Sequence, residues 1–310
     1  MSAAREEVVD LGDGVVLAVR VHDADLVEQG GAPRAGAMLV HGLASNARMW
    51  DACAAALTAE GVTVVAPDLR GHGRTASLPA LDPTSTDGQS DAPYGTPAAA
   101  ADVAALVAHY QLDGTLPPPV VLAGQSWGGN VVLTVVAQHP GQVDALALVD
   151  GGWLRFDTDE SFEQLWQRLR PPGWAGAGRE EAEQRIGAMV SGWGPHALPA
   201  VMANLTTDAD GHVRNILDVA AHEHILRSVH GADPRELYPH VSVPVLLAPA
   251  GDSPAAALVE EAVAGIPDAR LRRYPGAHHD LHLQHPQRLA ADIVDLLDEI
   301  SLATLRSSDA

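Results

Sequence analysis

The sequence predicts an α/β protein: a mostly parallel, eight-stranded sheet with helices on both faces and a helical insertion. Three observations support this fold class. Short, continuously apolar runs alternate with helical patterns along most of the chain, which is typical of parallel strands covered on both faces. The alternation stops over residues 152–240, where only helical patterns occur. Near the middle of the chain, an apolar run leads into a glycine-rich transition to a helix, Gly124-Gln125-Ser126-Trp127-Gly128-Gly129.

The first part of the predicted core covers residues 1–151. Apolar and β-branched residues on either side of the turn Gly12-Asp13-Gly14 predict a hairpin. Two apolar strands follow, and the helix between them is expected to stop at Gly61. In order, we expect strands at 6–11, 15–21 and 37–40, a helix at 49–60, a strand at 62–66, a helix at 97–110, a strand at 120–123, a helix at 127–138 and a strand at 145–149.

Residues 152–240 are predicted to form a helical cap over the end of the sheet that carries Ser126. Proline- and glycine-rich stretches separate its helical patterns, which lie at 161–169, 179–191 and 216–229. The core returns over residues 241–310, with strands at 243–248 and 270–274 and helices at 254–264 and 287–300. The last helix is expected to pack on the sheet because one face carries its large apolar residues, Leu289, Ile293, Leu296, Leu297 and Ile300.

The chain is strongly acidic, with 40 acidic and 19 basic residues and a formal net charge of −21 at pH 7. This charge argues against nucleic acid or an anionic membrane surface as a partner, because both need clustered cations. The single cysteine, Cys53, cannot form an intrachain disulfide, and the chain start lacks an apolar signal segment, so we expect a cytoplasmic protein. The His-rich stretches at 222–224 and 278–282 lack the His-Glu-x-x-His spacing, so neither a metal nor a cofactor is expected.

Ser126 lies at the centre of the predicted transition from strand to helix. A serine in such an elbow has a strained backbone, and glycines two positions before and after it avoid collisions with the neighbouring strand and helix. The helix that begins at Trp127 points free N–H groups toward the serine oxygen. Because a serine hydroxyl is a poor nucleophile, it needs a base and an acid that orients this base. The best base lies in the loop 275–282, and the best acid is Asp252, just after the strand 243–248.

Five segments of the chain match a known family in order. They are His41-Gly42-Leu43, residues 68–74, the elbow around Ser126, Asp252 and residues 276–286, which follow the third, fourth, fifth, seventh and eighth predicted strands. On these residues the chain resembles the α/β-hydrolases over nearly its whole length. The resemblance implies Ser126 as nucleophile, Asp252 as acid and His279 as base, in the family's usual chain order. It also implies an oxyanion hole formed by the N–H groups of Leu43 and Trp127.

Two of these assignments have an alternative in the sequence. His278 competes with His279 for the role of base, although the family commonly has glycine at the position of His278. Asp150 competes with Asp252 for the role of acid, because some members of the family take their acid from the end of the sixth strand. If Asp252 is the acid, Asp150 is expected to be a cap-hinge or pocket residue.

Loops near the predicted site are expected to be shaped by structural residues. His41 should hold the oxyanion turn in shape, and three polar side chains should brace the loop after the fourth strand, Asp68, Arg70 and His72. Residues 75–89 separate two halves of a segment that is continuous in much of the family, and they read as an inserted loop rich in proline and polar residues. This loop either gates the pocket or is a solvated insertion without function, and the sequence leaves both hypotheses open.

The predicted reaction is acyl transfer to water through a serine ester. The expected substrate is a small molecule, a neutral or apolar carboxylic ester or lactone, with water as co-substrate. A carbon–carbon bond hydrolase, an amidase and a perhydrolase use the same triad and remain alternatives, as does a small-ligand receptor that retains the fold. Four tryptophans in the cap are candidates for lining the pocket, Trp153, Trp166, Trp174 and Trp193. The sequence makes no prediction of the oligomeric state.

Overall fold

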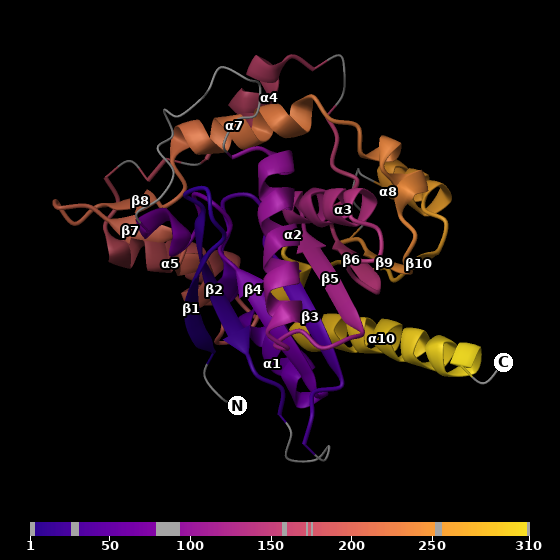
Figure 1. Cartoon of the computed structure of the whole chain (residues 1–310). Helices are drawn as coiled ribbons and strands as arrows, with labels where there is room; N and C mark the ends of the chain where they lie inside the picture. Colours follow the sequence, from indigo (N-terminus) through magenta and orange to yellow (C-terminus); the bar gives the residue numbers. More distant parts are fainter. Residues whose placement is uncertain are drawn as a thin grey trace.

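The computed structural model describes residues 4–25, 31–78, 94–156, 160–171, 173–174, 176–251 and 256–308. Eight strands form one sheet in the order β1-β2-β4-β3-β5-β6-β9-β10 (Figure 1). Strands β1 and β2 are antiparallel to each other, and β2 is antiparallel to β4, whereas all other neighbours in the sheet are parallel. This arrangement confirms the predicted fold class. The strands are β1 (Arg5–Asp10), β2 (Val16–His22), β3 (Ala35–Val40), β4 (Val62–Pro67), β5 (Val120–Gln125), β6 (Ala145–Val149), β9 (Val245–Ala248) and β10 (Ala269–Leu271).

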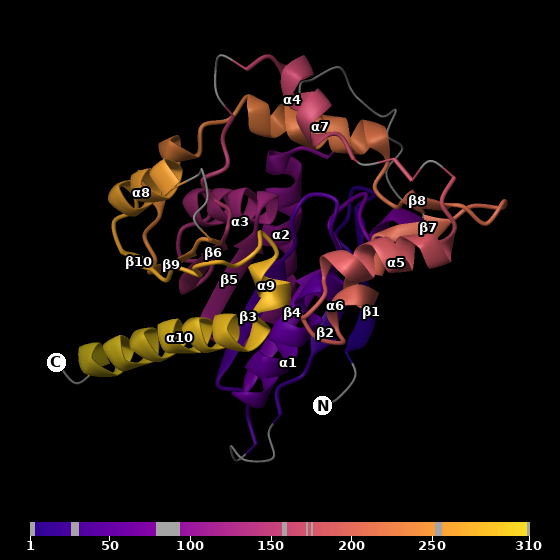
Figure 2. The same ribbon diagram turned by 180° about the vertical axis from the view of Figure 1, so that it is seen from behind.

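Helices cover both faces of the sheet. Helices α2 (Thr96–Leu112) and α3 (Trp127–Gln138) pack on one face, and α1 (Asp51–Ala59) and α10 (Pro286–Ser308) pack on the other (Figures 1 and 2). Successive residues of β5 point to opposite faces, so Val120 and Leu122 join the first apolar core and Val121 and Ala123 join the second. The continuous apolar run in the sequence therefore has a direct physical cause, since both faces of this strand are buried.

The carboxyl ends of the central strands meet at one edge of the sheet. In the parallel register, Val40 of β3 pairs with Gly124 of β5, and Gln125 of β5 pairs with Val149 of β6. The residues that directly follow these three strands, including Ser126, are therefore brought together although they are far apart in the sequence. Ligand sites of open α/β sheets lie at this end.

Residues 150–244 connect β6 to β9 and are called the insert below. Its elements are α4 (Phe162–Leu169), α5 (Arg179–Met189), α6 (Ala197–Met202), β7 (Leu205–Thr207), β8 (Val213–Asn215), α7 (Val219–His230) and the short 3-10 helices Pro234–Glu236 and Tyr238–His240. Figure 1 shows α4 and α7 above one end of the sheet, with α5 and the hairpin β7–β8 to one side. The insert is thus mainly helical, as predicted, but α6 and the hairpin were not expected. Strands of three residues are too short to leave a periodic pattern, and only the turn signal Asp210-Gly211 pointed to the hairpin.

Several elements differ from the sequence prediction at their ends. Helix α7 starts at Val219, three residues later than expected, because the side chain of Asp218 accepts a hydrogen bond from the Ala220 N–H and caps the helix there. Helix α10 continues to Ser308, since no glycine or proline follows position 300 to stop it. The expected apolar face of α10 is confirmed by the burial of Leu289, Ile293, Leu296 and Leu297.

Short elements lie near the predicted site, and the predicted inserted loop is described only at its start. Two short segments complete the core elements near the site, the 3-10 helix η1 (Ala47–Trp50) and α9 (Leu281–Gln284). The predicted inserted loop is described only as far as residue 78, which includes a 3-10 turn at Thr75–Ser77, and its remainder lies outside the described residues. Among the described helices, none combines the length and the apolar content that crossing a membrane requires.

Candidate active site

Ser126 sits in a strained turn between β5 and α3. Its backbone angles are φ 54° and ψ −125°, a left-handed region that side chains other than glycine rarely adopt. The turn is also tight, because a Cβ on Gly124 would lie 2.2 Å from the Gly128 carbonyl oxygen, and one on Gly128 would lie 2.4 Å from the His41 carbonyl oxygen. Glycine at these two positions is what permits strand, turn and helix to approach so closely. The Ser126 side chain stays partly exposed while its neighbours in the chain are buried.

His279 pairs with Asp150 at the same edge of the sheet. The Nδ1 atom of His279 lies 2.6 Å from Oδ2 of Asp150, and the other carboxylate oxygen accepts the Ala250 N–H at 3.0 Å. Asp150 directly follows β6, and the Ser126 N–H donates to the carbonyl of the preceding Val149 at 3.0 Å. The carboxylate therefore has a partner for each oxygen and belongs to the strand next to the one that ends at the elbow.

The surroundings of His279 change its proton affinity. Burial acts to lower the pKa of His279, but the hydrogen bond and charge of Asp150, with the charge of Asp280, outweigh it and leave the pKa raised. The His279 side chain is 47% exposed and that of Asp150 is 12% exposed. Because Nδ1 is held by the carboxylate, Nε2 is the ring nitrogen that remains to take up a proton.

Asp150 and His278, the alternative acid and base from the sequence, have different surroundings in the structure. Asp150, the alternative acid, is the residue that bonds His279, whereas Asp252 lies outside the described residues. His278, the alternative base, is 48% exposed, and its nearest carboxylate is that of Asp280 at 3.6 Å. The hydrogen bond to a carboxylate that a triad base requires is therefore found for His279 and Asp150.

Two histidines hold the turn that follows β3. The Leu69 N–H donates to Nε2 of His41 at 3.0 Å, so the proton of this ring is on Nδ1, which donates to the Gly42 carbonyl at 2.7 Å. In the same way, the Ala44 N–H donates to Nε2 of His72 at 3.2 Å. Both bonds need neutral rings, and burial indeed lowers the pKa of His41 and holds that of His72 well below its ordinary value. His41 thus has the structural role that the sequence predicted.

The N–H groups expected to form the oxyanion hole flank this arrangement. Trp127 is the first residue of α3, so its N–H has no partner within the helix. Leu43 lies between Gly42 and Ala44, the two residues that the histidines hold. Within the part of the chain that the structure describes, no hydrogen bond from the Leu43 or Trp127 N–H to another protein group is found.

The loop after β4 is braced by buried polar groups, as expected. Asp68 accepts hydrogen bonds from the Ala47 N–H at 2.7 Å and from the Arg74 N–H at 2.9 Å. Arg70 forms two bonds of 2.6 Å with the carboxylate of Asp102 in α2. These contacts connect the loop to η1 and to α2, so its position beside the turn after β3 is fixed.

One residue near the catalytic candidates escaped the sequence analysis. The side chain of Gln125 is nearly buried, and its Nε2 donates to the carbonyl oxygen of His279 at 3.2 Å. It therefore links the elbow to the loop that carries His279. Its position directly before Ser126 was the only available signal, because nothing in the spacing indicated a contact across more than 150 residues.

The four tryptophans of the insert do not share one environment. Trp153 is fully buried in the main core, and Trp166 packs edge-on against His222. The indole of Trp174 donates to Oδ1 of Asn215 at 3.0 Å. Trp193 lies with its ring centre 5.0 Å from that of His278. Of the four, Trp193 has a contact with the loop that carries His279, and the pocket role of all four stays a prediction.

A small cavity lies between the oxyanion turn and the insert. It has a volume of about 20 Å³ and is lined by Ala44, Ser45, Asn204 and Ile216, among others. A larger cavity of about 150 Å³ also includes Ile216 and extends to Tyr94. The shared residue places both cavities along the boundary between the core and the insert.

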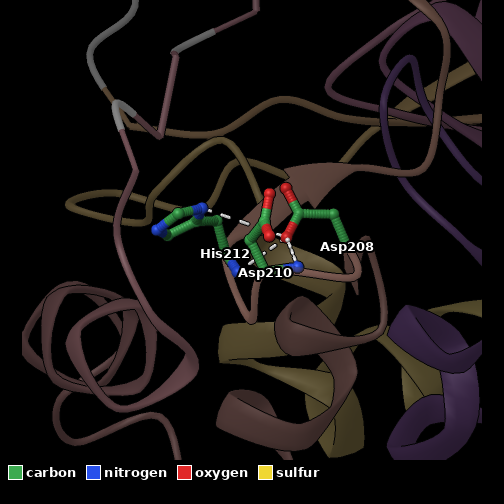
Figure 3. A group of neighbouring side chains, drawn as sticks. All are labelled: Asp208, Asp210 and His212. Carbon is green, nitrogen blue, oxygen red and sulfur yellow. Dashed lines mark hydrogen bonds and ion pairs between the residues drawn. The ribbon is translucent and has the colours of Figure 1, made fainter.

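The turn between β7 and β8 brings three possible metal ligands together. Oxygen and nitrogen atoms of Asp208, Asp210 and His212 lie within 4.8 Å of one another, and all three side chains are exposed (Figure 3). This group was not among the metal-site candidates in the sequence. One oxygen of Asp208 already accepts the N–H groups of Asp210 at 3.0 Å and His212 at 2.9 Å. The turn itself therefore accounts for the position of the Asp208 carboxylate.

The fold and the strained serine together define a protein of the α/β-hydrolase type, and comparisons with known proteins agree. Residues 37–292 match the Alpha/beta hydrolase family. The chain is 31% identical over 221 residues to the pimeloyl-(acyl-carrier protein) methyl ester esterase of Neisseria meningitidis serogroup B. The aligned region covers 67% of this chain and 71% of the esterase. The chain belongs to the alpha/beta hydrolase family and is an enzyme of that family.

Further matches extend over different shares of the chain. Lipase LipV of Mycobacterium tuberculosis is 32% identical over 151 residues, 49% of this chain and 50% of the lipase. The match thus spans half the length of that relative. Among solved structures, E-2-(acetamidomethylene)succinate hydrolase superposes with a TM-score of 0.71 at 21% identity, over 95% of this chain and 99% of the other. At this identity, the structural match supports the fold alone.

Proposed function

We propose that the protein is a serine hydrolase that cleaves a carboxylic ester or lactone, with Ser126 as nucleophile, His279 as base and Asp150 as the acid that orients this base. The observation that carries the proposal is the 2.6 Å contact between His279 Nδ1 and Asp150 Oδ2 at the edge of the sheet where the strained Ser126 emerges. We choose Asp150 over Asp252, the first choice from the sequence, because Asp150 is hydrogen-bonded to His279, whereas Asp252 lies outside the described residues.

The first half of the proposed reaction forms an acyl-enzyme. His279 Nε2 takes the proton from Ser126 Oγ as this oxygen attacks the carbonyl carbon of the ester. The carbonyl oxygen becomes an oxyanion and accepts hydrogen bonds from the N–H groups of Leu43 and Trp127. The C–O bond to the alcohol then breaks, and His279 gives its proton to the leaving oxygen. Asp150 stabilises the imidazolium throughout without accepting its proton.

The second half returns the enzyme to its starting state. Water loses a proton to His279 Nε2 and attacks the acyl carbon, a second oxyanion forms in the same hole, and Ser126 Oγ leaves with the proton from His279. Loss of one oxyanion donor typically costs about 3 kcal/mol of transition-state stabilisation. The hydrogen bonds that hold Gly42 and Ala44 on either side of Leu43 therefore matter for the rate, because they keep the Leu43 N–H in place.

The proposed substrate is neutral or apolar. The net charge of −21 disfavours an anionic substrate or an acidic partner surface. The named relatives, a methyl ester esterase and a lipase, act on esters, which supports this chemistry over cleavage of amides or carbon–carbon bonds. The insert is proposed to act as the cap, and the cytoplasmic location remains a prediction.

A fluorophosphonate probe tests the nucleophile directly. We expect the wild type to be labelled and the Ser126→Ala variant to remain unlabelled, because the probe forms a covalent bond with an activated serine. Turnover of short-acyl p-nitrophenyl esters and of lactones then tests the substrate class. A protein that is labelled at Ser126 but hydrolyses no ester or lactone would contradict the proposal and favour one of the alternatives, including a ligand receptor.

A further inference from the structure

One part of the insert contacts both loops that carry the proposed catalytic groups. These loops are the oxyanion turn (residues 41–46) and the base loop (residues 275–284), and the part of the insert is residues 193–204. On the side of the oxyanion turn, Asn46 is 1% exposed, and its Nδ2 donates to Asn204 Oδ1 at 2.6 Å and to the Ala200 carbonyl at 3.0 Å. The turn is thus fixed at its end by the insert and not by the sheet alone.

On the side of the base loop, the same segment makes two contacts. His196 Nε2 donates to the carbonyl of Leu283 at 2.8 Å. The ring of Trp193 lies against that of His278, the neighbour of the proposed base. The two ring centres are 5.0 Å apart, and such a contact limits the movement of the base loop without a hydrogen bond.

An apolar cluster joins the same three parts. Met49, which follows the oxyanion turn in η1, and Leu283, at the end of the base loop, are both buried. They pack into one cluster with side chains of the insert, including Ala197, Ala200 and Met202. Because buried apolar contacts resist small displacements, this cluster holds the two loops at a defined distance from each other.

We infer that residues 193–204 form a positioning element, which holds the oxyanion turn and the base loop at the spacing that the reaction needs. This inference rests on the proposed serine hydrolase function. Its residues act through Leu43 and His279, so they are positioning residues and not catalytic ones. The insert then does more than cover the substrate, since it completes the geometry of the site beneath it.

The expected signature is a loss of kcat at nearly unchanged KM. A shift of the reacting groups by about 1 Å costs on the order of 100-fold in rate, whereas binding of the ground state depends less on this alignment. An element that only stabilised the fold would instead lower the unfolding temperature and leave kcat of the folded enzyme intact.

The first test compares two variants of Asn204, one that removes the acceptor of the Asn46 hydrogen bond and one that keeps it. Asn204→Leu has a similar volume but cannot accept the hydrogen bond of Asn46, so we expect kcat for a p-nitrophenyl ester to fall about tenfold, with KM changed by less than about threefold. Asn204→Asp keeps an acceptor oxygen for Asn46 and should retain most of the activity. Equal kcat in the wild type and Asn204→Leu would overturn the inference.

The second test compares two matched histidines of the insert. His196 and His230 are both partly buried, and each donates Nε2–H to a backbone carbonyl at 2.8 Å, but His230 bonds Glu160 within the insert. We expect His196→Phe to lower kcat and the rate of fluorophosphonate labelling, and His230→Phe to leave both near the wild type. If the two variants lose the same activity, the effect belongs to the insert in general and the inference fails.

Hydrogen–deuterium exchange separates this inference from the proposed function. Asn204→Leu and His196→Phe should speed exchange in peptides that cover the oxyanion turn and the base loop, respectively, while His230→Phe should not. If the wild type fails to react with the probe, the proposed function is wrong, but faster exchange in these loops would still show that residues 193–204 hold both loops in place. Exchange unchanged from the wild type in both loops would overturn it, whatever the activity.

Discussion

The carboxylate of Asp150 lies 2.6 Å from Nδ1 of His279, although 129 residues separate the two in the chain. Asp150 follows β6 and His279 lies in the loop before α9, so the contact joins the edge of the central sheet to a loop near the end of the fold. The second oxygen of this carboxylate is held by the Ala250 N–H, which fixes its orientation. This contact is the one that the proposed triad requires between its acid and its base.

Replacement of Asp150 tests its role as the acid of the triad. We expect Asp150→Asn to lower kcat by about 10⁴-fold with little change in KM, because an amide can no longer hold the required tautomer of His279 or stabilise its charged form. The measurement is steady-state hydrolysis of the best p-nitrophenyl ester.

Asp252→Asn is the matched control. This substitution should change kcat by less than about threefold if Asp150 is the acid. A large loss in Asp252→Asn with near wild-type activity in Asp150→Asn would restore the assignment that the family resemblance implied.

The choice between the two acids shows how far the sequence can predict this site. The fold, the elbow and the position of the base loop follow from local patterns, because buried strands, glycine turns and helix starts each leave a signal within a few residues. Asp150 and Asp252 follow β6 and β9, and these strands are neighbours in the sheet, with Val149 paired to Ala248. Local patterns therefore mark the end of either strand equally well, and the contact of Asp150 with His279 depends on the three-dimensional path of the loop before α9.

The contacts of the insert with the core were beyond sequence analysis for a different reason. Asn46, Asn204 and His196 are single polar residues in turns or short elements, and their contacts span more than 80 residues. No periodicity or spacing records such pairs. The resemblance to a family did not help either, because the insert contains none of the matching segments.

The pH dependence of the reaction follows from the state of His279. As the proposed base, His279 must be neutral, and its pKa is raised above the ordinary histidine value because the hydrogen bond and charge of Asp150, with the charge of Asp280, outweigh the effect of burial. We expect kcat/KM to rise with pH and to reach its plateau only above that ordinary value. A profile measured with a neutral ester from about pH 5 to about pH 9 would show this rise.

The same profile for Asp150→Asn provides the control. Without the carboxylate, burial dominates, so the midpoint of the remaining activity should move to lower pH. An unchanged midpoint in this variant would show that another group, and not the pair of His279 and Asp150, controls the rise.

His282 is expected to make the protein sensitive to acid. It is fully buried, its ring packs against Trp50 with centres 4.6 Å apart, and neither ring nitrogen has a hydrogen-bond partner among the described residues. Burial lowers the pKa of His282 from 6.5 to about 4. Above pH 6.5 the ring is neutral in both folded and unfolded chains, and between these two values only the unfolded chain binds the proton. Stability should therefore fall as the pH drops through this range, by about 3 kcal/mol in full from this group.

Substitution of this histidine tests the acid effect. In His282→Phe, the free energy of unfolding measured with urea should fall less between pH 7.5 and pH 5 than in the wild type, by about 1 to 2 kcal/mol, since Phe fills a similar volume and binds no proton. The exposed His109→Gln serves as the control and should keep the wild-type dependence. Identical pH dependence in His282→Phe and the wild type would contradict this account.

Two glycines at the site should respond differently to an added methyl group. In Gly124→Ala, the new Cβ would lie 2.2 Å from the Gly128 carbonyl oxygen and 2.5 Å from its carbonyl carbon, which cannot move without α3. We expect destabilisation by about 2 kcal/mol or more. In Gly42→Ala, the nearest atom is Oε1 of Gln125 at 2.5 Å, the end of a side chain that can move.

Gly42→Ala should therefore keep most of its stability but lose activity. Once the amide of Gln125 moves, the next contact of the new Cβ is Cβ of Ser126 at 3.0 Å, so the nucleophile and the Gln125 bond to His279 are both disturbed. Thermal unfolding should separate the two variants, with a large drop for Gly124→Ala and a small one for Gly42→Ala, while the labelling rate of Ser126 falls in both. Because Gln125→Ala removes the contact with Oε1 but leaves the contact with Ser126 Cβ, the double variant Gly42→Ala with Gln125→Ala should be labelled more slowly than Gln125→Ala alone. Equal labelling of these two variants would mean that the methyl group acts through the side chain of Gln125 and not on Ser126 directly.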